Sequence, residues 1–355
     1  GTLQGEIVLP AGVSLAGGFG PDFDPAGRDA RRYVTRLEPA GGGVLIRSSG
    51  WGFSLVTGLF LEGQDRAAAG IHASDKLLAV RNTTIARAAG PGVSLVGDPY
   101  TESRIDGSLA FLRLLGNRGA GLFAGGLTGL WIQECLVRRN GSEGVKAREL
   151  SVNPEGDLVF RLDRCRMEAN ASMGVEVGLV GGPAPRGDQG PGRARVELNG
   201  CLIRDNGQEG ARAVADPDRG SGLDGRILVC SSDVVANGGS GILVQSSDLA
   251  LVLVHGNRVS ANRGAAGITV GAGSGGTTRV CNNAVFGNYR DGIRVLDTNE
   301  QRRVEVYNND IAANGLTGLS VGAEDTAVLS NTSVWNKVDV DAPWAAHTLR
   351  LSGTG

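Results

Sequence analysis

Hydrophobic and polar positions alternate in short runs along most of the chain. Residues 303–321 read RVEVYNNDIAANGLTGLSV, in which the runs VEV, NDI and GLSV are separated by turn-forming Asn and Gly. A period of two is typical of β-strands, because successive side chains of a strand point to opposite faces. We therefore predict three short strands joined by turns. The blocks contain no amphipathic stretch of about ten residues, which argues against the helical repeat families.

The same block recurs along the chain. Residues 279–295 read RVCNNAVFGNYRDGIRV and residues 253–270 read LVHGNRVSANRGAAGITV. One asparagine marks each block: Asn117, Asn140, Asn170, Asn206, Asn237, Asn262, Asn288 and Asn314. A glycine follows it in each block, and we expect this glycine column to supply a bend with positive φ.

A period in this range indicates a solenoid. If each block is one coil of three strands, stacked coils pair their strands in parallel. The predicted fold class is all-β, a single-stranded right-handed parallel β-helix with about 10–12 coils of roughly 22–36 residues. We predict an N-terminal coil and capping region over 1–53, repeats over 54–335 and a C-terminal capping segment over 336–355, in one structural domain.

A second column of small polar residues lies five positions before the marker asparagines. It contains Cys135, Cys165, Cys201, Ser232, Asn257, Asn283 and Asn309. Coils stacked about 4.8 Å apart allow each such side chain to hydrogen-bond the equivalent one in the next coil. We predict a structural ladder at these positions. The chain has five cysteines, an odd number, so we predict buried free thiols, with one disulfide among the first three as the alternative.

Composition excludes several classes of partner. The formal charge is −2 without a basic or acidic block, so no nucleic-acid partner is expected. The longest apolar runs have about six residues against the roughly 20 of a membrane span, so none is predicted. The chain opens on the strand-like GTLQGEIVLPAG, and no leader is recognised in it. The sequence does not indicate an oligomeric state.

The pattern V-x-N-N-x-I-x-x-N-x-x-x-G-I-x-V, clearest over 279–321, resembles the right-handed parallel β-helix repeat proteins of the pectate-lyase-like superfamily. The opening GVSLAGGF at 12–19, followed by the pair Arg28 and Asp29, is similar to the first coil of bacterial cell-surface β-helix proteins. The resemblance implies an extracellular or outer-surface location. It does not imply an activity, because the superfamily holds lyases, hydrolases, epimerases, adhesins and scaffolds.

The sequence lacks the local catalytic signatures of the galacturonan hydrolases and uronate epimerases in this superfamily, whereas the calcium-binding aspartates and arginine base of pectate lyases are assembled across coils and stay open. No Asp-Asp or Gly-His pair occurs, and no Asp-Pro is followed by His. The three histidines lie too far apart to form a zinc site, and no cofactor is predicted. Ca²⁺ is a weak candidate at the loop ADPDRGSGLDG, residues 215–225, where an ordinary polar turn is the alternative.

The candidate ligand-binding strip lies on the strand that follows each marker asparagine. Lys146, Glu176 and Arg212 are outward residues of consecutive coils, with alternating charge. Long insertions at 147–157, 178–195 and 214–226 follow these strands and place Asp188, Asp216 and Asp218 beside the strip. A wall of loops along a charged strip predicts a groove for a polysaccharide or a cell-surface glycan. Pairing of opposite charges across the strands is the alternative interpretation.

Two functions remain open. The first is a secreted or cell-surface β-helix that acts without catalysis, as an adhesin, an envelope scaffold or a glycan-binding module. The second is a polysaccharide lyase or related uronate-acting enzyme that uses the groove, with Arg212 as base or anion clamp. A phage or secretion-apparatus spike is a further alternative.

Overall fold

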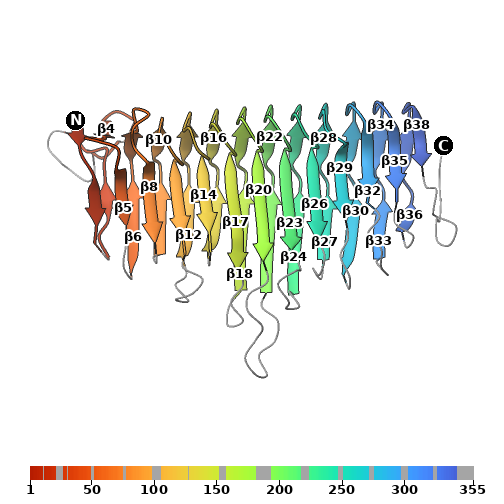
Figure 1. Cartoon of the computed structure of the whole chain (residues 1–355), viewed down its shortest axis with the longest axis horizontal. Coiled ribbons are helices and arrows are strands. Elements are labelled where there is room, and N and C mark those ends of the chain that lie inside the picture. The colour runs from red at the N-terminus through yellow and green to blue at the C-terminus, as the bar shows by residue number, and fades with distance from the viewer. Residues whose placement is uncertain are drawn as a thin grey trace, which may run out of the picture. The chain divides into compact units, whose positions relative to one another are not determined.

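A computed structural model describes most of the chain. It covers residues 1–10, 12–20, 27–29, 31–48, 52–74, 77–97, 105–126, 128–151, 157–180, 193–216, 224–246, 251–271, 276–296, 303–322 and 326–341. The chain forms two compact units, residues 1–150 with 162–172, and residues 151–161 with 173–355. Every regular element of the described residues is a β-strand (Figure 1).

The first unit contains strands of three parallel β-sheets, A, B and C. Consecutive strands along the chain belong to these sheets in turn. Sheet A has the order β1 (Thr2–Gln4), β4 (Thr35–Glu38), β7 (Leu59–Glu62), β10 (Thr84–Ala86), β13 (Arg113–Leu115), β16 (Leu136–Arg138) and β19 (Arg166–Glu168). Sheet B has β2 (Ile7–Leu9), β5 (Val44–Ser48), β8 (Ala69–Ser74), β11 (Val93–Val96), β14 (Leu122–Gly125) and β17 (Val145–Ser151). Sheet C has β3 (Leu15–Ala16), β6 (Phe53–Thr57), β9 (Leu77–Arg81), β12 (Ile105–Ala110) and β15 (Thr128–Gln133).

The second unit repeats this arrangement. Its sheet A contains β22 (Leu202–Arg204), β25 (Asp233–Val235), β28 (Arg258–Ser260), β31 (Ala284–Phe286), β34 (Asp310–Ala312) and β37 (Thr332–Val334). Sheet B contains β20 (Val175–Val180), β23 (Ala211–Asp216), β26 (Ile242–Ser246), β29 (Ala266–Gly271), β32 (Asp291–Val295), β35 (Thr317–Val321) and β38 (Val338–Asp341). Sheet C contains β18 (Asp157–Asp163), of which 157–161 belong here, β21 (Arg193–Asn199), β24 (Asp224–Cys230), β27 (Leu251–His255), β30 (Thr277–Cys281), β33 (Arg303–Tyr307) and β36 (Thr326–Leu329).

This topology confirms the predicted parallel β-solenoid. Within each unit, a strand pairs in parallel with the strand three elements further along the chain, as β27 does with β30 and β30 with β33. In the second unit, β38 pairs in parallel with β35 and so extends the repeat into residues 338–341. The predicted segment boundaries at 53 and 335 stay predictions. No helix in the described part of the chain has the length and hydropathy to cross a membrane.

Like side chains stack in the core. On sheet C of the second unit, one inward column contains Val229, Val254, Val280, Val306 and Val328, which are register partners from coil to coil. Each of them is at most 2% exposed. β-branched side chains fit a pleated surface that is buried on one side. The alternation seen in the sequence therefore points its apolar positions inward.

The predicted asparagine ladder is present. Asn257 Nδ2 donates to Asn283 Oδ1 at 3.0 Å, and Asn283 Nδ2 donates to Asn309 Oδ1 at 2.9 Å. Each oxygen also accepts from the backbone N–H of the preceding asparagine, at 2.9 and 3.0 Å. The column extends one rung further than the sequence indicated, to Asn331, whose Oδ1 accepts from Asn309 Nδ2 at 2.8 Å. These buried amides thereby satisfy one another.

The marker asparagines form a second ladder within each unit. In the first unit, Asn117 Nδ2 donates to Asn140 Oδ1 at 2.9 Å, and Asn140 donates in the same way to Asn170. In the second unit, the amide chain runs through Asn206, Asn237, Asn262, Asn288, Asn314 and Asn336. Asn336 is again one rung beyond the last asparagine recognised in the sequence.

All five cysteines are free thiols, and Cys135, Cys165 and Cys201 occupy ladder positions, whereas Cys230 and Cys281 end strands β24 and β30. Four are buried as predicted, but Cys230 is half-buried. Cys135 Sγ donates to Gln133 O at 3.3 Å, and Cys165 Sγ donates to Asp163 O at 3.4 Å, each two residues back. Asn309 Nδ2 makes the equivalent bond to Tyr307 O at 3.1 Å. A hydrogen bond with Cys165 and burial raise the pKa of the Cys135 thiol. The thiol hydrogen thus replaces one amide hydrogen of the ladder.

The glycine column differs from the expectation that it supplies a positive φ. Positive φ angles occur instead at the residue just before each ladder position, as at Arg139 (56°) and Ala236 (54°). The column glycines are needed because the backbone and the marker asparagine of the next coil lie too close for a side chain. A Cβ on Gly210 would lie 2.6 Å from Gly241 O and 2.8 Å from Asn237 Nδ2. The marker asparagine therefore packs against a backbone that has no room for a side chain.

Candidate functional site

The structure brings together two residues of the predicted strip. Glu176 on β20 and Arg212 on β23 are direct register partners, and Arg212 Nη1 lies 3.8 Å from Glu176 Oε1. Glu176 is buried, with 6% exposed. Asp188 and Asp218 lie outside the described residues, and for Asp216, the last residue of β23, the description covers the backbone alone. The Glu176–Arg212 contact is cross-strand charge pairing, the alternative interpretation of the sequence pattern.

Lys146 lies on β17 in the first unit. Its Nζ donates to Glu143 Oε1 at 2.8 Å, and Ser142 Oγ donates to Glu143 Oε2. Burial alone would raise the pKa of Glu143, but the hydrogen bonds from Lys146 and Ser142 outweigh it and lower this pKa below its usual value. The ammonium group therefore balances a buried carboxylate of its own coil. The strip as a ligand site stays a prediction.

Most of the loop predicted as a calcium site, residues 215–225, lies outside the residues that the structure describes. Residues 217–223 and the side chains of Asp216 and Asp224 are not described. Across the ranges given above, no three His, Cys, Asp or Glu side chains lie close enough together to hold a metal ion. Ca²⁺ at residues 215–225 stays a prediction.

A hollow of about 840 Å³ lies in the first unit and was not predicted from the sequence. One wall is the N-terminal segment that contributes Arg28, Asp29, Arg31 and Val34. The rest of the lining comes from the turns that follow β6, β9 and β12 and from the outer faces of β7, β10 and β13. Its volume is within the range of about 300–1,000 Å³ that is typical of small-ligand sites. The lining contains three arginines and one aspartate among its described residues.

One wall of the hollow is held in place by Arg28. Its Nε donates to Gly17 O at 2.7 Å, its Nη2 donates to Thr57 Oγ1 at 3.3 Å, and its guanidinium lies 5.6 Å from the centre of the Phe19 ring. These contacts fasten the segment to β6 and to the chain around Gly17. The pair Arg28 and Asp29, noted in the sequence for its resemblance to surface β-helix proteins, is thus part of a built wall.

Asp29 shapes the turn that presents Arg31. Its Oδ1 accepts from the backbone N–H of Arg31 at 2.8 Å and of Arg32 at 3.2 Å. Its own N–H donates to Gly18 O at 2.8 Å, and its carbonyl oxygen accepts from Tyr33 N at 2.8 Å. An aspartate that bonds the backbone two residues on is a common turn device. The Arg31 backbone is therefore fixed while its side chain is exposed.

The floor is a row of outward side chains on sheet A. Phe60 pairs in register with Thr84, and Thr84 pairs with Arg113, so the three lie one rung, about 4.8 Å, apart. Arg36 precedes Phe60 in the same row, with its guanidinium 5.3 Å from the ring centre. The row therefore changes from apolar to cationic along the hollow.

The rim is formed by three turn residues with left-handed backbones. Gly58, Asn82 and Phe111 have φ angles of 70°, 47° and 56°. Asn82 and Phe111 directly precede the buried residues Thr83 and Leu112, and this local geometry turns their own side chains outward. Phe111 is 49% exposed and lines the hollow, which the similarly exposed Phe53 does not. The hollow thus has an accessible aromatic face at its edge.

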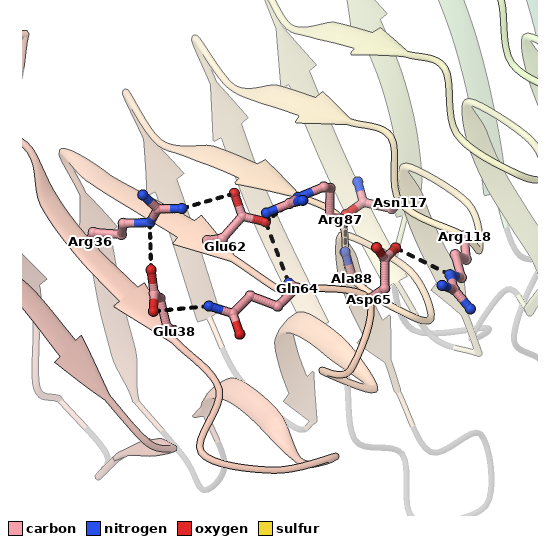
Figure 2. Close-up of polar contacts among 9 residues, drawn as sticks. All are labelled: Arg36, Glu38, Glu62, Gln64, Asp65, Arg87, Ala88, Asn117 and Arg118. Carbon is pink, nitrogen blue, oxygen red and sulfur yellow. Dashed lines mark hydrogen bonds and ion pairs between the residues drawn. The ribbon is translucent and has the colours of Figure 1, made fainter.

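A network of ion pairs neutralises the cations beside the floor (Figure 2). Buried Glu62 lies between Arg36 Nη2 at 3.4 Å and Arg87 Nε at 2.6 Å, and Arg36 also lies 2.9 Å from Glu38. Gln64 Nε2 donates to Glu38 Oε2 at 2.9 Å. The hydrogen bond to Glu62 raises the pKa of Arg87. The two arginines and the two glutamates of this network therefore balance one another.

Sequence reasoning missed most of the hollow. Arg28 and Asp29 were noticed, but Arg31, Phe111 and Arg113 were not. An aromatic residue at a turn position, directly before a ladder position, is the signal that could have identified Phe111. The wall could not have been identified in this way, because it is built by an aperiodic segment.

Comparison with known proteins shows the fold. A family model described as a right handed beta helix region matches residues 191–342. The A-modules of the mannuronan C-5 epimerases AlgE4 and AlgE6 from Azotobacter vinelandii have TM-scores of 0.55 and 0.54 and identities of 14% and 16%. The aligned regions cover 99% of this chain in both cases, and 88% and 87% of theirs.

The tailspike protein 3 of bacteriophage CBA120 has a TM-score of 0.49 and 10% identity, over 99% of this chain and 55% of that chain. A search of curated proteins by sequence found no match. The chain therefore has the fold of a right-handed parallel β-helix.

Proposed function

We propose that the protein is a secreted or cell-surface β-helix that binds a glycan without catalysis, and that the hollow of the first unit is its glycan site. The observation that carries this proposal is the exposed ring of Phe111 at the edge of a hollow of about 840 Å³ with polar walls. Sites for small polar ligands combine apolar or aromatic surface with a few placed polar groups.

The lining offers both kinds of contact that a sugar requires. A ring such as Phe111 provides an apolar face against which the C–H face of a pyranose can be buried. Asn82 and Thr84 provide an amide and a hydroxyl, which both donate and accept hydrogen bonds, as sugar hydroxyls do. The hollow therefore suits a sugar unit better than a wholly apolar ligand.

The charged groups of the lining favour binding over catalysis. Asp29 is the single carboxylate among the lining residues that the structure describes, and its Oδ1 already accepts two backbone hydrogen bonds. Glycoside cleavage by general acid–base chemistry ordinarily uses two carboxyl groups. The arginines are permanent cations at neutral pH and suit electrostatic recognition.

The structural neighbours support a glycan-related role. The two Azotobacter modules with TM-scores above 0.5 are epimerases of mannuronan. One fold hosts many functions, so this likeness supports the ligand class and does not extend to their reaction.

Binding to a panel of polysaccharides, measured by affinity electrophoresis and calorimetry, tests the proposal. Phe111→Ala should weaken binding at least tenfold, about 1.4 kcal/mol. Phe53, 53% exposed on sheet C away from the hollow, is the matched control, and Phe53→Ala should have no effect. Absence of binding across the panel, or equal effects of the two variants, would overturn the proposal. Release of unsaturated uronates that Arg212→Ala abolishes would instead establish the lyase alternative.

A further inference from the structure

We infer that the hollow selects saccharide units that carry an anionic group, with Arg31 and Arg113 as the residues that bind the anion. This inference rests on the proposed glycan site and adds its ligand chemistry. A carboxylate, a sulfate ester and a phosphate ester share that chemistry, because each presents two or more oxygens to a planar guanidinium.

The first argument is the balance of charge. Arg36, Arg87 and Arg118 each lie close to a carboxylate, at 2.9, 2.6 and 3.1 Å respectively (Figure 2). Arg31 and Arg113, in contrast, have no ion pair with any residue in the described ranges. Both are exposed and both line the hollow. Arg28, the third arginine of the lining, bonds only the neutral groups Gly17 O and Thr57 Oγ1, so the described lining holds three arginines against the one carboxylate of Asp29.

The second argument is their placement. Arg113 is the last residue of the floor row after Phe60 and Thr84, whereas Arg31 belongs to the wall. A sugar unit that lies against the Phe111 ring therefore has guanidinium groups from two separate parts of the chain within the same hollow. Cations that converge in a concave, partly apolar site attract an anion more strongly than isolated surface charges do.

The third argument is that the wall is positioned before any ligand binds. The Arg28 bonds to Gly17 O and Thr57 Oγ1 fasten the segment, and the Asp29 bond to the Arg31 N–H fixes the local backbone. Arg28 and Asp29 are thus positioning residues. A preorganised cation loses less conformational freedom on binding, which favours affinity.

The test compares polysaccharides of three kinds: a uronan, a sulfated or phosphorylated chain, and a neutral chain. We expect the wild-type protein to bind at least one anionic chain ten times or more tightly than the neutral chain, and this preference should shrink as salt rises. Arg31→Gln and Arg113→Gln should each reduce binding of the anionic chain at least fivefold more than they reduce binding of the neutral chain. The matched control is Arg258→Gln, since Arg258 is likewise the exposed first residue of a sheet A strand, β28, in the second unit.

Positioning is tested separately at Asp29. Asp29→Ala should weaken anionic binding although Asp29 carries the wrong charge to bind an anion. Asp29→Asn should restore it, because the amide oxygen still accepts from the Arg31 N–H. A stronger affinity in Asp29→Ala would show that Asp29 acts by its charge and would overturn the positioning role. Far-ultraviolet circular dichroism identifies any variant that fails to fold.

The two levels of proposal fail differently. If Phe111→Ala abolishes binding but neutral and anionic chains bind equally, with both arginine variants unaffected, the anion inference is wrong and the glycan site stands. If no polysaccharide of any kind binds, both are wrong. The ratio of uronan to sulfated-chain affinity identifies which anionic group the site prefers.

Discussion

The ladder predicts a large and local effect of truncating Asn283. Its Oδ1 accepts from Asn257 N at 2.9 Å and from Asn257 Nδ2 at 3.0 Å. Its Nδ2 donates to Val254 O at 3.0 Å and to Asn309 Oδ1 at 2.9 Å. Asn283→Ala removes all four bonds at a site that is 2% exposed. Groups of Asn257 and Val254 are then left unpaired in the interior.

Each buried polar group without a partner costs about 1–3 kcal/mol, so we expect Asn283→Ala to lower the free energy of unfolding by about 3–5 kcal/mol. Asn283→Ser should lose about half as much. Ser232 shows why, since its Oγ donates to Cys230 O at 2.9 Å and accepts from Cys201 N at 3.1 Å in the same column.

Urea titration followed by circular dichroism measures the stability, and amide hydrogen exchange at Asn257 reports the broken bond directly. A repeat structure can unfold in parts, which makes the local probe the sharper one. A loss below about 1 kcal/mol in Asn283→Ala, with the Asn257 amide still protected, would refute the ladder as a source of stability.

Three further predictions concern packing and charge. Gly210→Ala should lower the free energy of unfolding by about 2–3 kcal/mol, because the new Cβ would lie 2.6 Å from a backbone oxygen. Gly287→Ala should lower it by about 1 kcal/mol, because Gly287 has a φ of 60° but no atom within 4 Å of the new Cβ. Equal losses in urea titrations would contradict the close-approach argument. Lys146→Met should lower the free energy of unfolding by about 1–3 kcal/mol, because the carboxylate of Glu143 is 5% exposed and loses its ammonium partner; an unchanged midpoint would show that the pair contributes nothing. Burial, with the nearby charge of an arginine, lowers the pKa of His72. The unfolded chain therefore takes up the proton first, and the free energy of unfolding falls as pH decreases below about 6.5. His72→Gln should flatten this fall between pH 7 and 5, and identical pH profiles of the variant and the wild type would exclude His72 as its source.

The fold could be predicted because its determinants are periodic. The ladder residues Asn257, Asn283 and Asn309 lie 26 positions apart, so a local motif in the sequence directly reports the register of the coils. Alternation within each block then fixes which side chains point inward. The ladder was predicted too short because Asn331 and Asn336 follow a coil of 22 residues, shorter than those before it.

The hollow could not be predicted because its determinants are aperiodic. Arg28 bonds Thr57 across 29 positions, and neither residue belongs to the repeat motif. Phe111 occupies the turn position that recurs before each ladder position, but the repeat does not specify which residue type stands there. For the predicted ligand-binding strip, the sequence predicted the contact between residues but not its role. Glu176 and Arg212 meet as the spacing predicted, but register alone does not distinguish a binding site from a charge pair that stabilises the coil.

The amide chain of the second unit has a direction, and this makes it modular. Every oxygen from Asn237 to Asn314 receives hydrogens from the preceding coil, and every amide nitrogen passes hydrogens on to the next. Asn262, Asn288 and Asn314 are therefore interchangeable links. Excising the 26 residues from Asn262 to the position before Asn288 would therefore join like to like. Genetic duplication or loss of whole coils is thus a route by which such a chain can change its length without redesigning its core.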